Sequence, residues 1–228
     1  MILAAGRGSR MNELTATTPK PLVPVLGKPL IEYHLEKLER AGFKDVVVNV
    51  SWLAQKLQYY FEHVYSGALN ITVVHERQAL ETGGGVYNAL EHLSSNNEPF
   101  LVINSDVMTD FDYATVKKSM TGLAHLYLIA NPLHNRGGDY AIIEPDTLSL
   151  KKECEEAESF TFSGISILTP KLFESAEHEK FSLVKVFDQA ISKQMITAQV
   201  LTNQWFDVGT LERLALAQDW QAKNNNVL

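Results

Sequence analysis

The stretch MILAAGRGSRM at residues 1–11 decides the fold class, because an apolar run passes directly into a glycine loop. Residues 1–3 are apolar and predict a short buried strand. Gly6 and Gly8 follow at once, and glycine permits a tight turn in which the backbone can approach a ligand closely. The stretch therefore predicts the first strand and first loop of an α/β fold.

The following residues alternate apolar runs with amphipathic helical patterns, which is typical of parallel βαβ units. We expect strands at 45–50, 71–75 and 100–104, and helices at 30–41, 55–63 and 82–93. The pattern then changes to strands at 123–130, 140–143, 148–151, 162–168 and 197–201, helices at 183–192 and 211–222, and a turn at 205–210. We expect a Rossmann-like, mostly parallel sheet flanked by helices, with a smaller mixed-sheet half. Residues 1–228 form one domain in this interpretation, divided near residue 110.

Bulk composition excludes several classes of protein. The chain has 228 residues, 45% hydrophobic content and a net charge of −7, so it lacks the cationic balance of a general nucleic-acid or acidic-membrane binder. No apolar run reaches the roughly 18 residues of a membrane span, and no signal peptide is evident. A single cysteine, Cys154, forms no internal disulfide and is expected to be a bystander. These features predict a cytoplasmic protein.

The glycine loop carries the first chemical signal. Gly6 and Gly8 can form an anion nest with their N–H groups, while Arg10 and Lys20 can neutralise phosphate charge. A simple tight turn is the usual explanation for a lone Gly-x-Gly, but Arg10 and the Thr-Pro-Lys-Pro stretch at 18–21 favour phosphate binding. The loop is not a P-loop, because no Gly-Lys-Ser/Thr follows, and it lacks the third glycine of a dinucleotide fingerprint.

The motifs together resemble the signature of the sugar-1-phosphate nucleotidylyltransferase family. They are LAAGRGSRM at 3–11, TPKPLVP at 18–24, ETGGG at 81–85, NSD at 104–106, FSGIS at 162–166 and WFDVGT at 205–210. The resemblance covers nearly the whole chain in the right order. It implies the nucleotidyltransferase fold, with a nucleotide-binding half at about 1–110 and a sugar-binding half at about 111–228.

The resemblance also implies a metal site. Asp106 follows a predicted buried strand and Asp207 precedes a glycine; either alone is more often a cap or turn residue. Together they can hold Mg²⁺, which prefers oxygen ligands and keeps phosphate and water as the others. The family mechanism is in-line attack of a sugar phosphate on the α-phosphorus, with Arg10, Lys20 and Asp106 as the catalytic residues and no covalent enzyme intermediate.

Substrate-binding residues follow by family position. For the nucleotide they are Ala4, Ala5, Gly6, Gly8, Ser9, Arg10, Lys20, Glu76 and Gly83; for the sugar phosphate they are Asn104, Asp139, Glu153 and Gly164. The family commonly has Glu-Lys-Pro near Glu153, where this chain reads KECEE, so the register there stays open. A family lysine falls near Lys180 or Lys185. For Gly84 and Gly85, close helix packing is as good an explanation as ligand contact.

Within the family, segments 80–85, 137–140 and 162–164 are most similar to members that act on an amino-sugar phosphate. The expected reaction joins UTP and N-acetyl-α-muramate 1-phosphate to give UDP-N-acetylmuramate and pyrophosphate, in cell-wall recycling. His134 or Arg136 could accept the lactyl carboxylate. The alternatives are a mannose-1-phosphate guanylyltransferase and, in another class, a non-catalytic sugar-nucleotide sensor. We expect a monomer or weak homodimer.

Overall fold

The structure is a computed structural model that describes residues 1–116, 120–144, 147–153 and 157–225. Cys154, Glu155 and Glu156 lie outside the described residues. The chain divides into two compact units, each considered by itself. The loop unit comprises Ile2–Ala79, Asn104–Thr115 and Gln204–Leu228. The mixed-sheet unit comprises Met1, Leu80–Ile103 and Val116–Asn203. This division differs from a single boundary near residue 110, because two later segments return to the loop unit.

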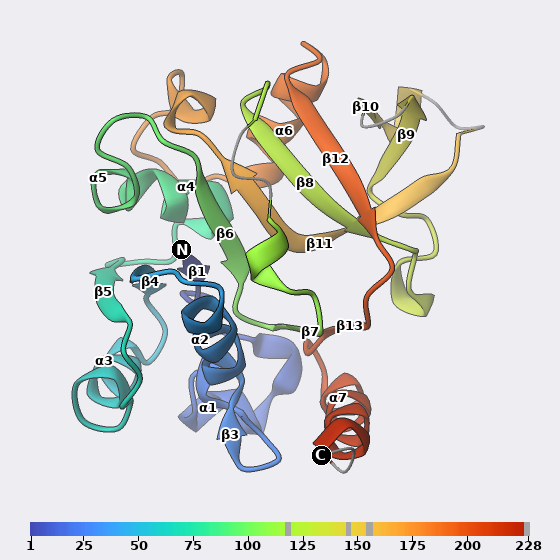
Figure 1. Cartoon of the computed structure of the whole chain (residues 1–228). Helices are drawn as coiled ribbons and strands as arrows, with labels where there is room; N and C mark the ends of the chain where they lie inside the picture. The colour runs from blue at the N-terminus through green and yellow to red at the C-terminus, as the bar shows by residue number, and fades with distance from the viewer. Residues whose placement is uncertain (117–119, 145–146, 154–156, 226–228) are drawn as a thin grey trace. The chain divides into compact units, whose positions relative to one another are not determined.

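A parallel sheet forms the centre of the loop unit. Its strands are β1 (Ile2–Leu3), β4 (Asp45–Val50) and β5 (Asn70–His75), in the order β5-β4-β1 (Figure 1). Ile2 pairs with Val48, and Val48 pairs with Val73. The valine run of β4 is buried, as expected for a central parallel strand that is covered on both faces. All three strands were predicted from the sequence.

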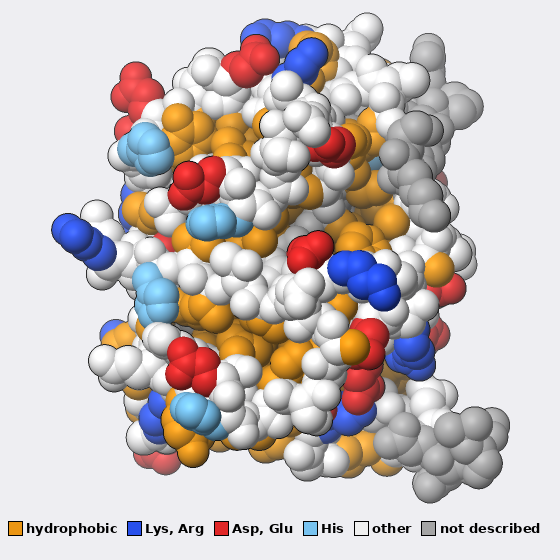
Figure 2. Space-filling view, turned by 60° about the vertical axis from the view of Figure 1, so that its left-hand side comes forward, with side chains coloured by type: hydrophobic (Ala, Val, Ile, Leu, Met, Phe, Trp, Pro, Cys, Tyr) orange, Lys and Arg blue, Asp and Glu red, His pale blue; other side chains and the backbone are white. Residues whose placement is uncertain are grey.

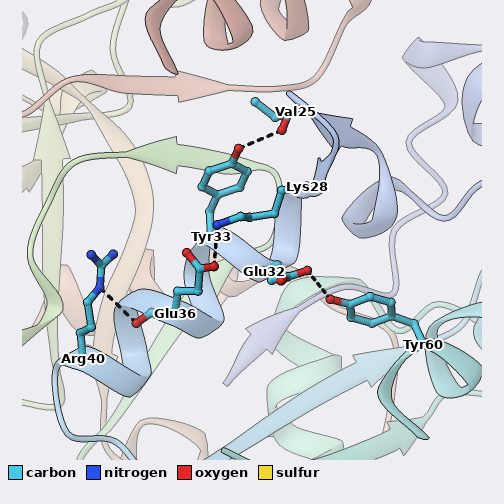
Figure 3. Close-up of polar contacts among 7 residues, drawn as sticks. All are labelled: Val25, Lys28, Glu32, Tyr33, Glu36, Arg40 and Tyr60. Atoms are coloured by element: carbon cyan, nitrogen blue, oxygen red, sulfur yellow. Dashed lines mark hydrogen bonds and ion pairs between the residues drawn. The ribbon is translucent and has the colours of Figure 1, made fainter. Parts of the chain in front are cut away.

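Helices α2 (Leu30–Arg40), α3 (Ala54–His63) and α7 (Leu211–Asn225) complete the loop unit, with a short α1 (Glu13–Thr17) after the glycine loop. The buried face of α2 recurs at helical spacing, and Gly42 ends the helix at a φ of +86°. On its other side, Lys28 Nζ lies 2.5 Å from Glu36 Oε1, and Tyr60 donates to Glu32 at 2.6 Å (Figure 3). These contacts tie α2 to the preceding hairpin and to α3.

Two short antiparallel ribbons were not predicted. One pairs β2 (Pro24–Val25) with β3 (Lys28–Pro29), and the other pairs β7 (Val107–Thr109) with β13 (Trp205–Asp207). The predicted turn at 205–210 is wrong for its first three residues, which form β13. A three-residue strand whose partner is distant in sequence has no local periodicity that could reveal it.

The mixed-sheet unit has the strand order β6-β11-β8-β12-β10-β9 (Figure 1). These strands are β6 (Phe100–Asn104), β8 (Ala124–Ile129), β9 (Tyr140–Glu144), β10 (Thr147–Leu150), β11 (Ser159–Leu168) and β12 (Ile196–Leu201). The last residue of β6, Asn104, belongs to the loop unit. Strands β12 and β8 are parallel, whereas β11 runs antiparallel to β6 and β8. The expected mixed sheet is therefore present.

The helices of this unit are α4 (Glu81–Asn88), α5 (Leu90–Leu93) and α6 (Leu183–Ile191). The single helix predicted at 82–93 is wrong, because the chain breaks at Ala89, whose N–H bonds back to Val86 over a tighter turn. Lys151, predicted to end a strand, instead begins the 3₁₀ turn Lys151–Glu153.

The surface carries charged side chains of both signs, as the composition of the chain requires. Acidic and basic side chains are interspersed on the face drawn in Figure 2. Among the described residues, no helix is both long enough and apolar enough to cross a membrane.

Candidate active site

The glycine loop lies directly after β1, and its two glycines have different roles. Gly8 has a φ of +65°, and a Cβ placed there would lie 3.1 Å from the Lys20 side chain and 3.2 Å from that of Thr15. Both the backbone conformation and the close packing therefore favour glycine. A Cβ at Gly6 would meet nothing within 4 Å, so the loop leaves open space there. Ser9 and Arg10 are exposed beside this space.

Lys20 joins the loop to the predicted metal ligand Asp106. Lys20 begins a 3₁₀ turn, and its side chain is only 10% exposed. Its Nζ lies 2.5 Å from Asp106 Oδ2, an ion pair with restricted access to water, where electrostatic interactions are stronger than at the surface. The structure thus places the lysine between the glycine loop and a carboxylate, as a phosphate-binding site would require.

The β7–β13 ribbon brings the two predicted metal ligands to neighbouring positions. Asp207 pairs with Val107, and the N–H of Val208 donates to the carbonyl of Asp106 at 2.8 Å. The two carboxylate side chains are 27% and 21% exposed, so a ligand can reach them. In the described part of the chain, no group of three or more His, Cys, Asp or Glu could hold a metal by itself. The pair fits a divalent cation that takes its other ligands from phosphate and water.

Gly209 marks the point where the ribbon meets the arginine of the loop. A Cβ there would lie 2.2 Å from Arg213 Nη2, 2.8 Å from Asp207 Oδ1 and 3.0 Å from Arg10 Nη2. Two guanidinium groups and one carboxylate therefore surround this glycine. Arg10 and Asp207 were predicted as site residues from the sequence, whereas no role was predicted for Gly209 or Arg213. Arg213 lies on the first turn of α7, and its side chain leans toward the N-terminal end of the helix, where Gly209 is.

Helix α2 supports the ribbon from one side. Lys37 Nζ donates to the carbonyl of Thr109 at 2.7 Å, and His34 Nδ1 lies 2.7 Å from the Tyr113 hydroxyl. Burial, aided by the charge of Lys37, lowers the pKa of His34 to about 4. Burial also lowers the pKa of Lys37 to about 8. At neutral pH the ribbon is therefore held by a neutral imidazole and a cationic lysine.

Buried polar groups connect the start of the loop to Glu76. Asn49 accepts a hydrogen bond from the Ala4 N–H at 2.9 Å and donates to Glu76 Oε1 at 2.7 Å. Asn49 and Glu76 are 1% and 6% exposed. The Ala4 N–H is therefore occupied, and Asn49, which no sequence pattern indicated, connects the loop to Glu76.

Gly83 lies in the mixed-sheet unit, where packing accounts for it. The N–H groups of Gly83 and Gly84 both donate to the carbonyl of Phe181, at 2.9 and 3.0 Å. A Cβ at Gly83 would lie 2.4 Å from the Phe181 ring. These N–H groups are engaged within the fold, which favours the packing explanation. Lys180 and Lys185 pair with Glu81 and Glu179 at 3.5 and 3.3 Å on the exposed surface nearby.

Asp139 lines a cavity of about 440 Å³ in the mixed-sheet unit. Its oxygens accept hydrogen bonds from Asn135 Nδ2 at 2.9 Å and from the Phe162 N–H at 2.8 Å. The other lining residues are Gly138, Tyr140, Leu150, Lys151, Phe162, Val184 and Asp188. Burial, with the charges of Asp188 and Asp139, raises the pKa of Tyr140, which stays a neutral phenol.

Three other predicted sugar residues lie elsewhere. Gly164 has a φ of +79° at an irregularity of β11, between Phe162 and Ile165. Glu153 is exposed at the end of a 3₁₀ turn, and Asn104 ends β6 in the loop unit. Among the described residues that line the cavity, Lys151 is the cation; His134 and Arg136 are not part of the lining.

Comparison with known proteins places these features in context. A family model for nucleotidyl transferases matches residues 1–224. N-acetylmuramate alpha-1-phosphate uridylyltransferase of Neisseria meningitidis serogroup B is 40% identical, with 96% of each chain covered. The mannose-1-phosphate guanylyltransferase catalytic subunit beta of Drosophila pseudoobscura pseudoobscura is 31% identical over 92% of this chain and 58% of that protein. The solved structure of HddC from Yersinia pseudotuberculosis, complexed with GMP-PN, matches with a TM-score of 0.76 at 24% identity, covering 96% and 97% of the two chains. This likeness confirms the expected fold class.

Proposed function

Since the chain belongs to the nucleotidyl transferase family, we propose that it transfers a uridylyl group from UTP to N-acetyl-α-muramate 1-phosphate. The products are UDP-N-acetylmuramate and pyrophosphate, and the reaction serves peptidoglycan recycling. The observation that carries the proposal is the meeting of the glycine loop, Lys20, Asp106 and the β7–β13 ribbon within one unit. The full-length similarity to a uridylyltransferase of this specificity supports the choice of substrates.

The residues of the loop unit take separate roles in this proposal. The backbone at Gly6 and Gly8 lets the triphosphate approach closely, while Arg10 and Lys20 neutralise its oxygens. Asp106 and Asp207 would hold Mg²⁺, which when bound stabilises negative charge on the α-phosphate and the departing pyrophosphate. A phosphate oxygen of the sugar attacks the α-phosphorus as the bond to pyrophosphate breaks. Positioning and charge stabilisation supply the catalysis, without a covalent intermediate.

The acceptor is assigned to the cavity beside Asp139. Its volume of about 440 Å³ falls in the range of small-molecule sites. Phe162 and Tyr140 offer apolar surface to a sugar ring, and the carboxylates of Asp139 and Asp188 offer acceptors for hydroxyl and amide hydrogens. We assign the lactyl carboxylate to Lys151, because it is the cation of the described lining.

One observation favours a second candidate, a guanylyltransferase acting on mannose 1-phosphate. Glu76, assigned to the base by resemblance, is a buried carboxylate that can only accept hydrogen bonds when ionised. Guanine offers two adjacent N–H donors, whereas uracil offers one. A carboxylate beside the base suits the two donors of guanine, so GTP with mannose 1-phosphate is the pair of substrates to test against UTP.

The decisive experiment crosses four nucleoside triphosphates with a panel of sugar 1-phosphates and measures pyrophosphate release with Mg²⁺. We expect the highest kcat/KM for UTP with N-acetyl-α-muramate 1-phosphate. N-acetylglucosamine 1-phosphate is the matched control, because it differs only by the lactyl group. Release with GTP and mannose 1-phosphate, and none with the muramoyl substrate, would establish the second candidate instead. Binding without any turnover would indicate a sensor.

The proposal also includes the oligomeric state and the cellular location of the enzyme. We expect a monomer or weak homodimer that acts in the cytoplasm. Sedimentation velocity at several concentrations tests the first, since a stable dimer would keep the sedimentation coefficient of a dimer on dilution. Fractionation of cells that express the protein tests the second.

A further inference from the structure

Arg213 is a mostly buried cation that the roles above leave unused. It lies on the first turn of α7, where its N–H donates to Thr210 Oγ1 at 3.2 Å and the Leu214 N–H donates to the Thr210 carbonyl at 2.9 Å. Thr210 thus caps the helix and fixes its first turn. The Arg213 side chain, 14% exposed, leans back toward Gly209, as helical side chains do.

The guanidinium of Arg213 faces the metal-binding carboxylate. Its Nη2 lies 3.4 Å from Asp207 Oδ2, close enough for an ion pair. Its Nε and Nη2 are buried and make no hydrogen bond to any described residue. A buried donor without a hydrogen bond costs free energy, so a purely structural role explains this geometry poorly. The cost is tolerated beside a carboxylate whose orientation matters for metal binding.

Gly209 shows how closely the groups are arranged. The same absent Cβ position lies within 3.0 Å of Arg213 Nη2, Asp207 Oδ1 and Arg10 Nη2. Arg213, Arg10 and the Asp207 carboxylate therefore all approach one point. The combined charge of the two arginines exceeds that of Asp207, so the surroundings stay attractive to anions even with the carboxylate present. The ion pair with Arg213 restricts the conformational freedom of the Asp207 carboxylate.

We infer that Arg213 is a positioning residue for the transfer reaction: it holds the Asp207 carboxylate in the orientation that binds the divalent cation. This inference rests on the proposed function for the identity of the metal site. Outer-shell partners of metal ligands typically change metal affinity by 10- to 100-fold when they are removed, a range of about one to two orders of magnitude. In this inference Arg213 acts through Asp207 and is not a catalytic residue.

The test measures metal binding directly. Mn²⁺ binding to the full-length protein is followed by electron paramagnetic resonance without substrate, in the wild type, Arg213→Met, Arg213→Lys and the control Arg40→Met. Arg40 is an exposed residue of α2 that bonds to the carbonyl of Glu36. We expect Arg213→Met to weaken Mn²⁺ binding about tenfold, Arg213→Lys to recover part of the loss because it keeps the charge, and Arg40→Met to change nothing.

A second readout separates positioning from general damage. In turnover assays, Arg213→Met should raise the Mg²⁺ concentration for half-maximal rate about tenfold, while the KM for UTP at saturating Mg²⁺ changes less than about threefold. Unchanged Mn²⁺ affinity in Arg213→Met would overturn the inference, whatever happens to the rate. If Arg213→Met does not fold, Arg213→Lys carries the same test. Should Arg213→Met weaken Mn²⁺ binding while the wild type turns over no sugar phosphate, the proposed function fails and the positioning role stands.

Discussion

His34 makes stability depend on pH in a way that can be measured. Burial, aided by the charge of Lys37, lowers its pKa from 6.5 to about 4 in the folded protein. The unfolded chain therefore takes up a proton near pH 6.5, whereas the folded protein resists protonation until about pH 4. Protonation favours the unfolded state, so stability is lost as the pH falls below 6.5. Linkage gives a loss of about 2.5 kcal/mol between about pH 7.5 and about pH 4.5.

The assay is urea unfolding at several pH values, comparing the wild type with His34→Gln. Glutamine keeps an amide that can reach the Tyr113 hydroxyl but does not titrate. The variant should start less stable and lose about 2.5 kcal/mol less over the same range. His63→Gln is the control, because the His63 side chain is 56% exposed, and its curve should parallel the wild type. Parallel curves for wild type and His34→Gln would refute the reasoning.

The remaining predictions concern the site. Gly209→Ala places a Cβ 2.2 Å from Arg213 Nη2, so we expect at least about a tenfold loss of kcat/KM with a Tm change of only a few degrees by calorimetry; wild-type kinetics would contradict the crowding argument. Asp106→Asn should reduce kcat by about 100-fold or more while UTP binding by calorimetry persists. Lys151→Met should raise KM about tenfold for N-acetyl-α-muramate 1-phosphate but leave that for N-acetylglucosamine 1-phosphate unchanged; equal effects on both acceptors would remove Lys151 from carboxylate recognition.

Local patterns were enough for the elements that carry their own signal. The valine run of β4 and the amphipathic α2 with its terminal Gly42 were predicted within a residue or so. The β7–β13 ribbon was not, because neither strand is long enough to show a period and each exists only through its partner. The break between α4 and α5 at Ala89 was also not predicted, because no glycine or proline stands there to indicate it.

The residues of the candidate site also fall into those that could be predicted from the sequence and those that could not. The family resemblance indicated Lys20, Asp106 and Asp207, whose residue types suit the chemistry of phosphate and metal binding. Asn49 and Arg213 escaped notice because their importance lies in what they contact, a buried Glu76 in one case and a carboxylate in the other. Partners that act through another side chain become visible only when tertiary distances are known.

The returning C-terminal segment has a consequence for how the protein is made. Val208, Leu214 and Ala217 pack in one cluster with Met11, Val23 and Val25, so apolar residues that are synthesised early are covered only after residues 208–217 have been made. During synthesis the early part of this cluster is exposed to water until the later residues cover it, a state prone to aggregation. Asp207 arrives with the same segment. Catalytic competence is therefore postponed until this segment has been synthesised, and a ribosome-stalled chain that lacks it should be inactive and in need of a chaperone.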